Sequence, residues 1–256
     1  MPLPAIAGFI LGAIVGSFLA TILVRWPEGR SVVAGRSRCD GCGAALGPLE
    51  LVPILSFLVR RGRCRRCGAA IDWRHAAIEL GAGTIGLVAV LVHPLPLAGA
   101  TMLLGWMLLL IAALDAEHQW LPDALTLPLV ALGLLSGWAG LGPPLLDRAI
   151  GAAAGWLVLV LLGLAYRVLR GREGLGGGDP KLLAAIGAWL GALHLPFVLL
   201  GAGLLGLAAA LAMKVRGREV GRTTRLPLGT FMALAAWPIW LIFDTIHSGR
   251  IQPNLL

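Results

Sequence analysis

The sequence predicts an all-α polytopic membrane protein with about eight transmembrane helices and one small four-cysteine module. Of the 256 residues, 58% are hydrophobic and only 13% are charged, and the mean hydropathy is +0.86. This composition excludes an ordinary soluble domain. Apolar segments near the roughly 20 residues needed to cross a bilayer follow one another along the chain. Only residues 25–75 form a long polar interruption.

These segments predict three parts: a first transmembrane helix in residues 1–24, a polar module in 25–75 and a membrane domain in 76–256. The first apolar run has no basic region before it and is long enough to span, so it predicts a helix and not a cleaved signal peptide. The apolar segments are 3–24, 76–92, 95–114, 124–141, 149–166, 182–193, 195–213 and 227–246.

The basic residues predict the orientation in the membrane. Nineteen of the 21 Lys and Arg residues lie in segments 25–75, 167–181 and 214–226. If the spans alternate, these segments share one side with residues 115–123. Because positively charged loops stay in the cytoplasm, we expect this side to be cytoplasmic and both chain ends to be periplasmic. The net charge of +8 then reflects topology and contact with lipid head groups, and not a nucleic-acid partner.

Residues 25–75 contain two C-x-x-C pairs, Cys39/Cys42 and Cys64/Cys67, with 21 residues between them. Two such turns at this separation are typical of a structural Zn²⁺ site with four thiolate ligands, as in zinc ribbons. A module of this size has too small a core to fold alone, so metal binding would stabilise it. Redox-active or free thiols are the main alternative. A catalytic zinc is disfavoured because four thiolates leave no open position.

The sixth apolar segment, residues 182–193, is too short for an ordinary span. Its twelve residues rise about 18 Å at 1.5 Å per residue, against a hydrocarbon core of about 30 Å. A re-entrant segment would place the basic residues after 213 on the wrong side, so we expect a short span. Such a helix would thin the bilayer locally and admit water to Asp179.

Two carboxylates at membrane boundaries are the candidate catalytic groups. Asp115 follows the third apolar segment, and Asp179 follows the glycine-rich residues 174–178, where it is well placed to cap the next helix. If the third and sixth helices pack together, the two aspartates can act as general acid and general base on one water, which is the apparatus of peptide hydrolysis. The helix ends favour Asp179 as base and Asp115 as acid. A proton or ion pathway is the competing explanation.

Other acidic residues have more ordinary interpretations. Asp123 and Asp147 stand at helix starts and are expected to be caps. Glu79 lies about one turn inside the second span, where it can serve a function or pair with Arg74. The sequence shows no constellation for a serine nucleophile and no phosphate-binding loop.

The order of these motifs resembles the bifunctional prepilin leader peptidase/N-methyltransferase family of type IV pilus and type II secretion systems. The similarity covers nearly the whole chain. Its motifs are Gly16-Ser17-Phe18-Leu19, Arg25-Trp26-Pro27, the two cysteine pairs with Val52-Pro53-Ile54-Leu55-Ser56 and Arg61-Gly62-Arg63-Cys64, Ile78-Glu79, Asp115 to Asp123, Gly176-Gly177-Gly178-Asp179 and Leu226-Pro227-Leu228-Gly229. The chain departs from the family pattern at Ala20, Phe57 and His75-Ala76-Ala77.

The resemblance implies a multi-pass aspartic endopeptidase of the bacterial inner membrane. Asp115 and Asp179 match the catalytic pair of the family. The enzyme would cut the leader from prepilins or pseudopilins on the cytoplasmic side and methylate the new N-terminus with S-adenosylmethionine, and Glu79 is a candidate for the methylation site. The alternatives are an intramembrane-type aspartic peptidase for other substrates and a proton-coupled transporter that uses the buried aspartates.

Overall fold

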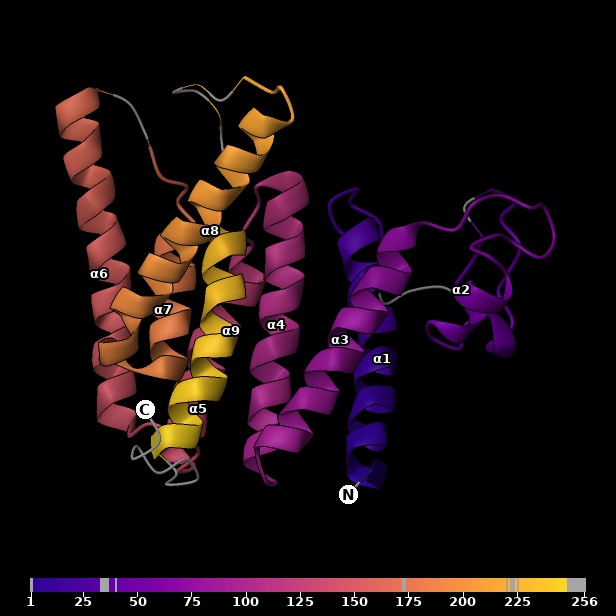
Figure 1. The fold of residues 1–256 in the computed structure, drawn as a ribbon, viewed down its shortest axis with the longest axis horizontal. Coiled ribbons are helices and arrows are strands. Elements are labelled where there is room, and N and C mark those ends of the chain that lie inside the picture. Colours follow the sequence, from indigo (N-terminus) through magenta and orange to yellow (C-terminus); the bar gives the residue numbers. More distant parts are fainter. Residues whose placement is uncertain are drawn as a thin grey trace. The chain divides into compact units, whose positions relative to one another are not determined.

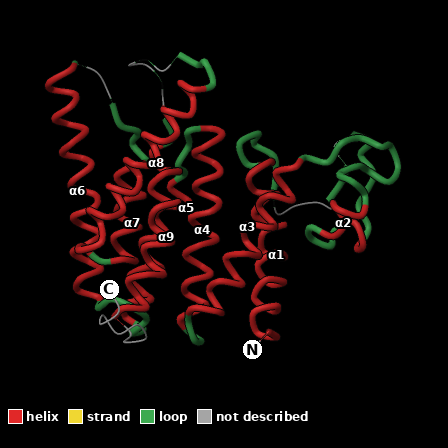
Figure 2. Tube along the Cα trace, viewed as in Figure 1, coloured by secondary structure: helices red, strands yellow, loops and turns green. Residues whose placement is uncertain are grey.

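The computed structural model describes residues 2–32, 37–39, 41–171, 174–219, 221, 224 and 226–247 (Figure 1). Of side chains, those of Pro2 and residues 243–247 are not described. Within these residues the secondary structure is helical, and Figure 2 shows helices joined by loops without a strand. The helices are α1 (Pro2–Arg25), α2 (Leu55–Val59), α3 (Trp73–Val92), α4 (Leu97–His118), α5 (Asp123–Trp138), α6 (Leu145–Arg170), α7 (Asp179–Leu190), α8 (Leu195–Val215) and α9 (Leu228–His247).

The all-helical membrane fold that the sequence predicts is confirmed. Each of the eight apolar segments forms a helix, and the short α2 lies in the polar module. Five of the described helices, namely α1, α3, α4, α6 and the α8 segment, are long and apolar enough to cross a membrane. Helices α5 and α7 are shorter, with 16 and 12 residues, and the side chains of α9 are described only over Leu228–Ile242. Eight complete spans therefore remain a prediction.

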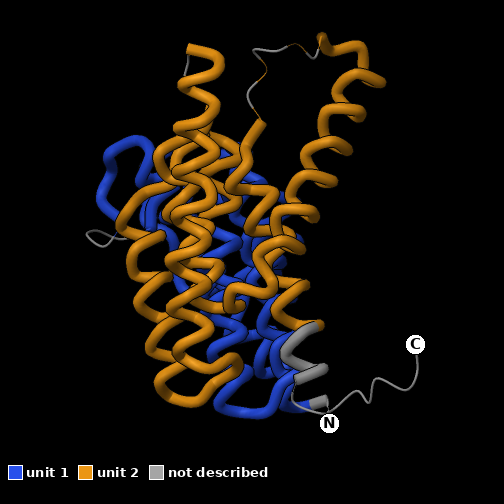
Figure 3. Tube along the Cα trace, turned by 90° about the vertical axis from the view of Figure 1, so that its left-hand side faces the viewer, with its two compact units in different colours: residues 1–110 blue, residues 111–256 orange. Residues whose placement is uncertain are grey.

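The chain forms two compact units, residues 1–110 and residues 111–256 (Figure 3). The boundary falls inside α4. The predicted division into residues 1–24, 25–75 and 76–256 follows the polarity of the chain, whereas the two units follow packing, so that division stays a prediction.

In the first unit, α1 and α3 pack at very short range. Gly8, Gly12 and Gly16 lie on one face of α1, spaced by one helical turn, and a side chain at any of them would collide with α3. At Gly16 an added Cβ would lie 2.7 Å from the Cα of Glu79. Small residues at such spacing let helix backbones approach closely in a membrane. Glycines therefore bring α1 and α3 into close contact in the first unit.

In the second unit, α7 is the central helix. It contacts α5, α6 and α9, and each of its residues except Lys181 is buried. Gly151 and Gly155 of α6 face α7 closely, since a Cβ at Gly151 would lie 2.5 Å from the Gly187 carbonyl oxygen. The surrounding helices thus shield a helix that is too short to span by itself, and they fix the direction of its N-terminal residue, Asp179.

The C-terminal end of α7 is closed by Arg148, whose side chain is fully buried. Its guanidinium donates to the carbonyl oxygens of Gly133 (2.8 Å), Ala188 (3.3 Å) and Leu141. The guanidinium carbon also lies 6.0 Å from the ring centre of Trp189 and 5.6 Å from that of Trp240. These acceptors and rings replace the water that a buried cation loses.

Candidate active site and metal centre

Asp115 lies near the C-terminal end of α4 and is only 5% exposed. Its Oδ2 atom accepts a hydrogen bond from the Thr230 backbone N–H at 2.7 Å. The single proton of the Thr230 hydroxyl is shared between Asp115 Oδ2 at 3.1 Å and the Ala112 carbonyl oxygen at 2.9 Å. Because Thr230 is in the first turn of α9, its N–H has no partner within that helix. The Asp115 carboxylate supplies this partner.

Asp179 is the first residue of α7 and is 7% exposed. Its Oδ2 atom accepts the Gly176 N–H at 3.0 Å. The prediction that Asp179 caps α7 is wrong, since the N-cap residue is Gly178 and no side chain caps this helix. The carboxylate instead points back toward the glycine-rich loop that precedes α7, where the Gly176 N–H holds it.

The structure brings the two predicted aspartates into one site. Leu121 lies in the loop after α4 and packs on Gly178 and Gly229. A Cβ added at Gly178 would lie 2.5 Å from the Leu121 Cβ, and a Cβ added at Gly229 would lie 3.0 Å from the Leu121 Cδ atoms. A Cβ at Gly229 would also lie 3.0 Å from Asp115 Oδ2. The loops around Leu121, Gly178 and Gly229 therefore meet at the carboxylates.

An ion pair joins the two aspartate segments at their surface. Lys181, on the first turn of α7, places its Nζ atom 2.6 and 2.7 Å from the two carboxylate oxygens of Asp123 on α5. Asp123 was expected to cap α5, and this is wrong, because Pro122 is the N-cap residue and no side chain caps the helix. The pair fixes α7 against α5 two residues from Asp179.

The hydrogen bonds bear on which aspartate is ionised. Bonds donated to a carboxylate favour its charged form. Asp115 accepts the Thr230 backbone N–H at the N-terminal end of α9, whereas Asp179 accepts the Gly176 N–H. The prediction of Asp179 as base considered only the helix to which each aspartate belongs, and the contact with α9 adds a second helix end. The division of roles stays a prediction.

The four predicted cysteines form one cluster that can hold a metal ion. The four Sγ atoms lie within 4.8 Å of one another, and those of Cys39 and Cys67 are 3.8 Å apart. A tetrahedral site with Zn–S bonds of about 2.3 Å has sulfur atoms about 3.8 Å apart. The donor set and its spacing therefore fit Zn²⁺. Asp40, between the first two cysteines, lies outside the described residues.

The two cysteine turns have the same backbone geometry. In the first, the Gly43 N–H donates to the Cys39 carbonyl oxygen at 2.8 Å, and in the second the Gly68 N–H donates to that of Cys64 at 3.0 Å. Gly43 and Gly68 have φ values of +67° and +72°, which glycine adopts without strain. Backbone N–H groups of Cys67 and Arg66 lower the pKa of the Cys64 thiol to about 6, whereas burial and the neighbouring thiols raise the pKa of Cys67 to about 11. The turn thus favours the thiolate form, which binds metals, at Cys64.

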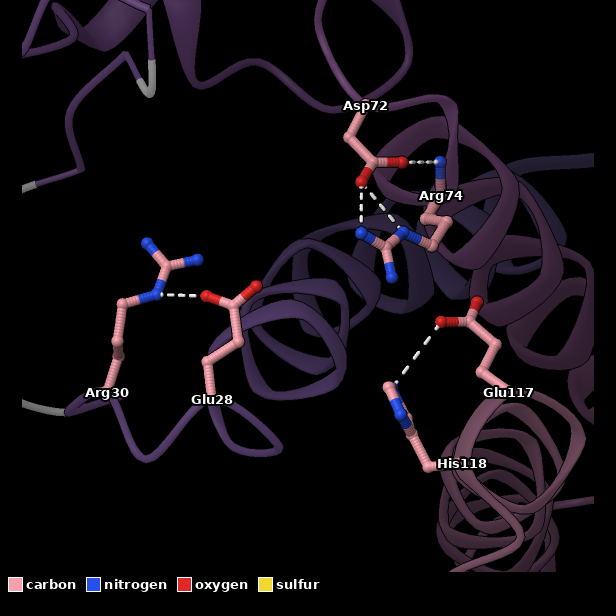
Figure 4. A network of polar contacts seen from close by, with 6 residues as sticks. All are labelled: Glu28, Arg30, Asp72, Arg74, Glu117 and His118. Atoms are coloured by element: carbon pink, nitrogen blue, oxygen red, sulfur yellow. Dashed lines mark hydrogen bonds and ion pairs between the residues drawn. The ribbon is translucent and has the colours of Figure 1, made fainter.

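Glu79, on the first half of α3, is 7% exposed. Its Oε2 atom accepts the Ile54 N–H at 2.7 Å. Ile54 has a φ of 60° and a ψ of −51°, a conformation that costs a β-branched residue about 1–3 kcal/mol and that often marks a functional site. Arg74, the partner expected for Glu79, is instead paired with Asp72, the N-cap of α3 (Figure 4).

The Asp72–Arg74 pair lowers the pKa of Asp72 and lies at the start of α3. The Arg74 side chain and its backbone N–H donate to Asp72 at 2.7 and 2.9 Å. They hold the pKa of Asp72 below its usual value. Figure 4 also shows two other local pairs, Glu28 with Arg30 and Glu117 with His118. His118 is therefore engaged by its neighbour on α4.

Two residues that matter in the structure escaped the sequence analysis. Thr230 follows a motif that was recognised, but a threonine one residue after a glycine turn carries no distinguishing signal. Arg148 is one of the two basic residues that lie outside segments 25–75, 167–181 and 214–226. The position of Arg148 away from the other basic residues was the signal that the sequence offered, because a lone arginine at a span boundary is costly unless it has partners. Asp147, expected as a cap, instead accepts the Ala192 N–H at 3.2 Å.

Comparison with known proteins gives a consistent result over most of the chain. The model of the bacterial peptidase A24 N-terminal domain matches residues 10–93, and that of the type IV leader peptidase family matches residues 102–211. A protein of Pseudomonas aeruginosa named prepilin leader peptidase/N-methyltransferase is 36% identical, with 95% of this chain and 92% of its own length aligned. A protein of the same name from Dickeya chrysanthemi is 39% identical, over 91% of this chain and 88% of its own length. Another from Dichelobacter nodosus is 38% identical, over 80% of this chain and 70% of its own length. No solved structure matches the chain.

Proposed function

The chain belongs to the type IV leader peptidase family, and we propose that it is a membrane aspartic endopeptidase that removes the leader peptides of type IV prepilins. After cleavage it methylates the new N-terminal amine. The observation that carries the peptidase function is the pair of buried aspartates, Asp115 and Asp179, which two helix ends and a glycine-rich loop bring together.

The mechanism follows from two carboxylates that share a site. They do not both ionise readily, so one holds a proton near neutral pH. Thr230 favours the ionised form of Asp115, which takes a proton from the attacking water. Asp179, in its protonated form, donates its proton to the scissile carbonyl oxygen as water adds. When the C–N bond breaks, Asp115 passes the proton it took from water to the leaving amine, and Asp179 takes back a proton from the gem-diol hydroxyl.

The substitutions Asp115→Asn and Asp179→Asn test the peptidase function. Each preserves side-chain shape but removes an acid–base group, so we expect leader cleavage to fall by about 10³-fold or more. Mass spectrometry of a purified prepilin incubated with each variant measures this loss. Asp147→Asn, at the opposite end of the second unit's helices, is the control and should retain cleavage. A proton-coupled transporter would give no cleavage with the wild-type chain, and efficient cleavage by either variant would refute the assignment.

The cysteine cluster is a structural zinc site in this proposal. Four thiolates complete a tetrahedral shell and leave no position for substrate, so bound zinc supplies folding energy and not catalysis. Cys39, Cys42, Cys64 and Cys67 would hold the ion, and the matching turns at Gly43 and Gly68 support this role.

We further propose the orientation in the bacterial inner membrane. The cysteine module and the two aspartates face the cytoplasm, and both chain ends lie in the periplasm, because nearly all Lys and Arg residues fall on the proposed cytoplasmic side. Arg36, Arg172, Arg222 and Arg225, which contribute to this charge, lie outside the described residues. S-adenosylmethionine is the methyl donor, which provides an activated methyl group on a sulfonium sulfur. Prepilins are the protein substrates.

A further inference from the structure

The outward side of α2 is apolar, although this helix belongs to the polar module. Leu55, Leu58 and Val59 recur at helical spacing and are 58%, 65% and 74% exposed. Ser56 and Phe57, which lie between them in the sequence, line an internal cavity of the first unit. A helix at a boundary between protein and water turns its apolar side inward. Because α2 instead exposes three aliphatic side chains, its outer side calls for an apolar surrounding.

A neighbouring turn extends this surface. Leu49 lies in the turn Pro48–Glu50 and is 81% exposed, and Leu51 directly after it is 44% exposed. The ion pair between Glu50 and Arg60, at 3.0 Å, joins this turn to the end of α2. Exposed aliphatic side chains that gather in this way mark a contact with a protein or a membrane. The apolar patch consists of Leu49, Leu51, Leu55, Leu58 and Val59.

Glu79, which lines the same cavity, fixes the level of α2 along the first unit. The N–H of Ile54, directly before α2, donates to Glu79 Oε2 at 2.7 Å. Helix α3 begins at Trp73 and is long and apolar enough to cross a membrane, and Glu79 lies about 9 Å along it at 1.5 Å per residue. Figure 1 shows α2 at the height of the upper part of α1 and α3, and not beyond their ends. The apolar patch therefore lies beside the membrane-spanning helices, at the level where a span meets the lipid head groups.

A groove with an excess of positive charge adjoins the apolar patch. Its volume is about 500 Å³, and Leu49 of the patch lines it. Three guanidinium groups, those of Arg60, Arg65 and Arg66, also line it, together with the single carboxylate of Glu50. Guanidinium groups bind phosphate through paired hydrogen bonds. The groove therefore suits an anionic phosphate group.

We propose that the cysteine module docks on the anionic phospholipids of the cytoplasmic leaflet. The apolar patch lies among the first carbons of the acyl chains, and the groove binds the phosphate groups. Interfacial segments bury their apolar side about 5–10 Å into this boundary, which agrees with the level that Glu79 sets for α2. This contact goes beyond the general attraction of basic loops to lipid, because it assigns a defined face of the module. It uses the proposed cytoplasmic placement and is independent of both catalytic activities.

A nitroxide at residue 58 tests whether α2 enters the lipid. Because the four cysteines form the metal site, the label is attached to a ketone-bearing amino acid in place of Leu58, in the full-length chain reconstituted in phosphatidylglycerol nanodiscs. Power-saturation electron paramagnetic resonance compares access by oxygen, which concentrates among acyl chains, with access by a water-soluble nickel chelate. We expect oxygen to dominate, at a depth of about 5–10 Å.

Two other results of this measurement would overturn the proposal. Dominant access by the chelate would place the patch in water, as expected if it binds a protein that the nanodiscs lack. Exclusion of both reagents would show that another part of the chain, or a second copy of it, covers the patch.

Arg65→Gln combined with Arg66→Gln tests the role of the groove. Each arginine near an anionic surface contributes about a factor of five to binding. We therefore expect the ratio of docked to undocked nitroxide to fall about tenfold or more, and the wild-type ratio to fall likewise in uncharged phosphatidylcholine nanodiscs. Arg216→Gln combined with Arg218→Gln removes the same charge after α8 and is the matched control, which should stay within about twofold of wild type. An unchanged ratio in the first variant would overturn the role of the groove.

Two controls keep docking separate from folding and from catalysis. A metal content equal to that of wild type shows that the cysteine turns of a variant are intact. Prepilin cleavage, measured in the same nanodiscs, reports the proposed peptidase function, so a failure of that function and a failure of docking are seen independently.

Discussion

At the scale of single residues, the site depends on how each carboxylate is held. Asp115 and Asp179 could be predicted as the catalytic pair from the sequence, because each stands beside a membrane segment within a recognisable motif. The sequence did not identify their partners. Thr230 lies 115 residues from Asp115 in the chain, and only the packing of the second unit brings the two together. The partner of Glu79 was missed for a similar reason, since a backbone N–H at Ile54 has no side-chain signature.

Thr230→Val tests the positioning of Asp115. The substitution keeps the shape and the backbone N–H but removes the hydroxyl that donates at 3.1 Å. A hydrogen bond to a charged group contributes about 1.5–3 kcal/mol, so we expect kcat for prepilin cleavage to fall by about tenfold or more with little change in KM. Steady-state kinetics measures both constants. Thr230→Ser, which retains the hydroxyl, should recover most of the rate, and a valine variant as active as wild type would contradict this role.

At the scale of elements, hydropathy predicted where the helices lie but not how they end. Apolar runs are local features, so all eight segments were found. The three predicted aspartate caps failed because each side chain bonds elsewhere, Asp123 to Lys181, Asp147 to Ala192 and Asp179 to Gly176. Capping rules consider one helix at a time, whereas in a tightly packed bundle these carboxylates serve neighbouring segments.

Arg148 anchors the end of α7 that is opposite Asp179, and Arg148→Lys tests this anchor. Lysine offers three donors on a flexible stem and cannot reproduce the planar fork that serves several acceptors and two tryptophan rings. Since buried acceptors would lose partners, we expect a loss of about 2–3 kcal/mol in the free energy of unfolding. Thermal unfolding in detergent measures it as a lower melting temperature. The matched control is Arg170→Lys at the exposed end of the same helix, and equal melting temperatures for both variants would disprove the anchor.

At the scale of the whole molecule, the two compact units divide the proposed activities. The cysteine cluster and the cavity at Glu79 belong to residues 1–110, and both aspartates belong to residues 111–256. The resemblance predicted both activities from ordered motifs. It did not predict a boundary inside α4, because the boundary reflects packing density and α4 is a continuous apolar helix.

Zinc removal should therefore affect the two activities unequally. A strong chelator withdraws the ion that stabilises the cysteine module, and the module contributes much of the wall of the cavity at Glu79, the candidate methylation site. We expect donor binding and N-methylation to fall by about tenfold or more, since a structural zinc site supplies most of the folding energy of its module. Leader cleavage should stay within about twofold of the untreated enzyme, as the aspartates pack in the other unit. Metal analysis measures the bound zinc, calorimetry measures donor binding, and mass spectrometry measures N-methylation and leader cleavage. Equal loss of both activities would contradict their division between the two units.

The bond between Thr230 and Asp115 also has a consequence for biogenesis. Both aspartates leave the ribosome well before α9 is synthesised, yet Asp115 acquires its two donors only when that last helix has inserted. A nascent or truncated chain that ends before Thr230 would hold both carboxylates without the geometry that poises them. We therefore expect leader cleavage to begin only once α9 has been synthesised and has packed against α4.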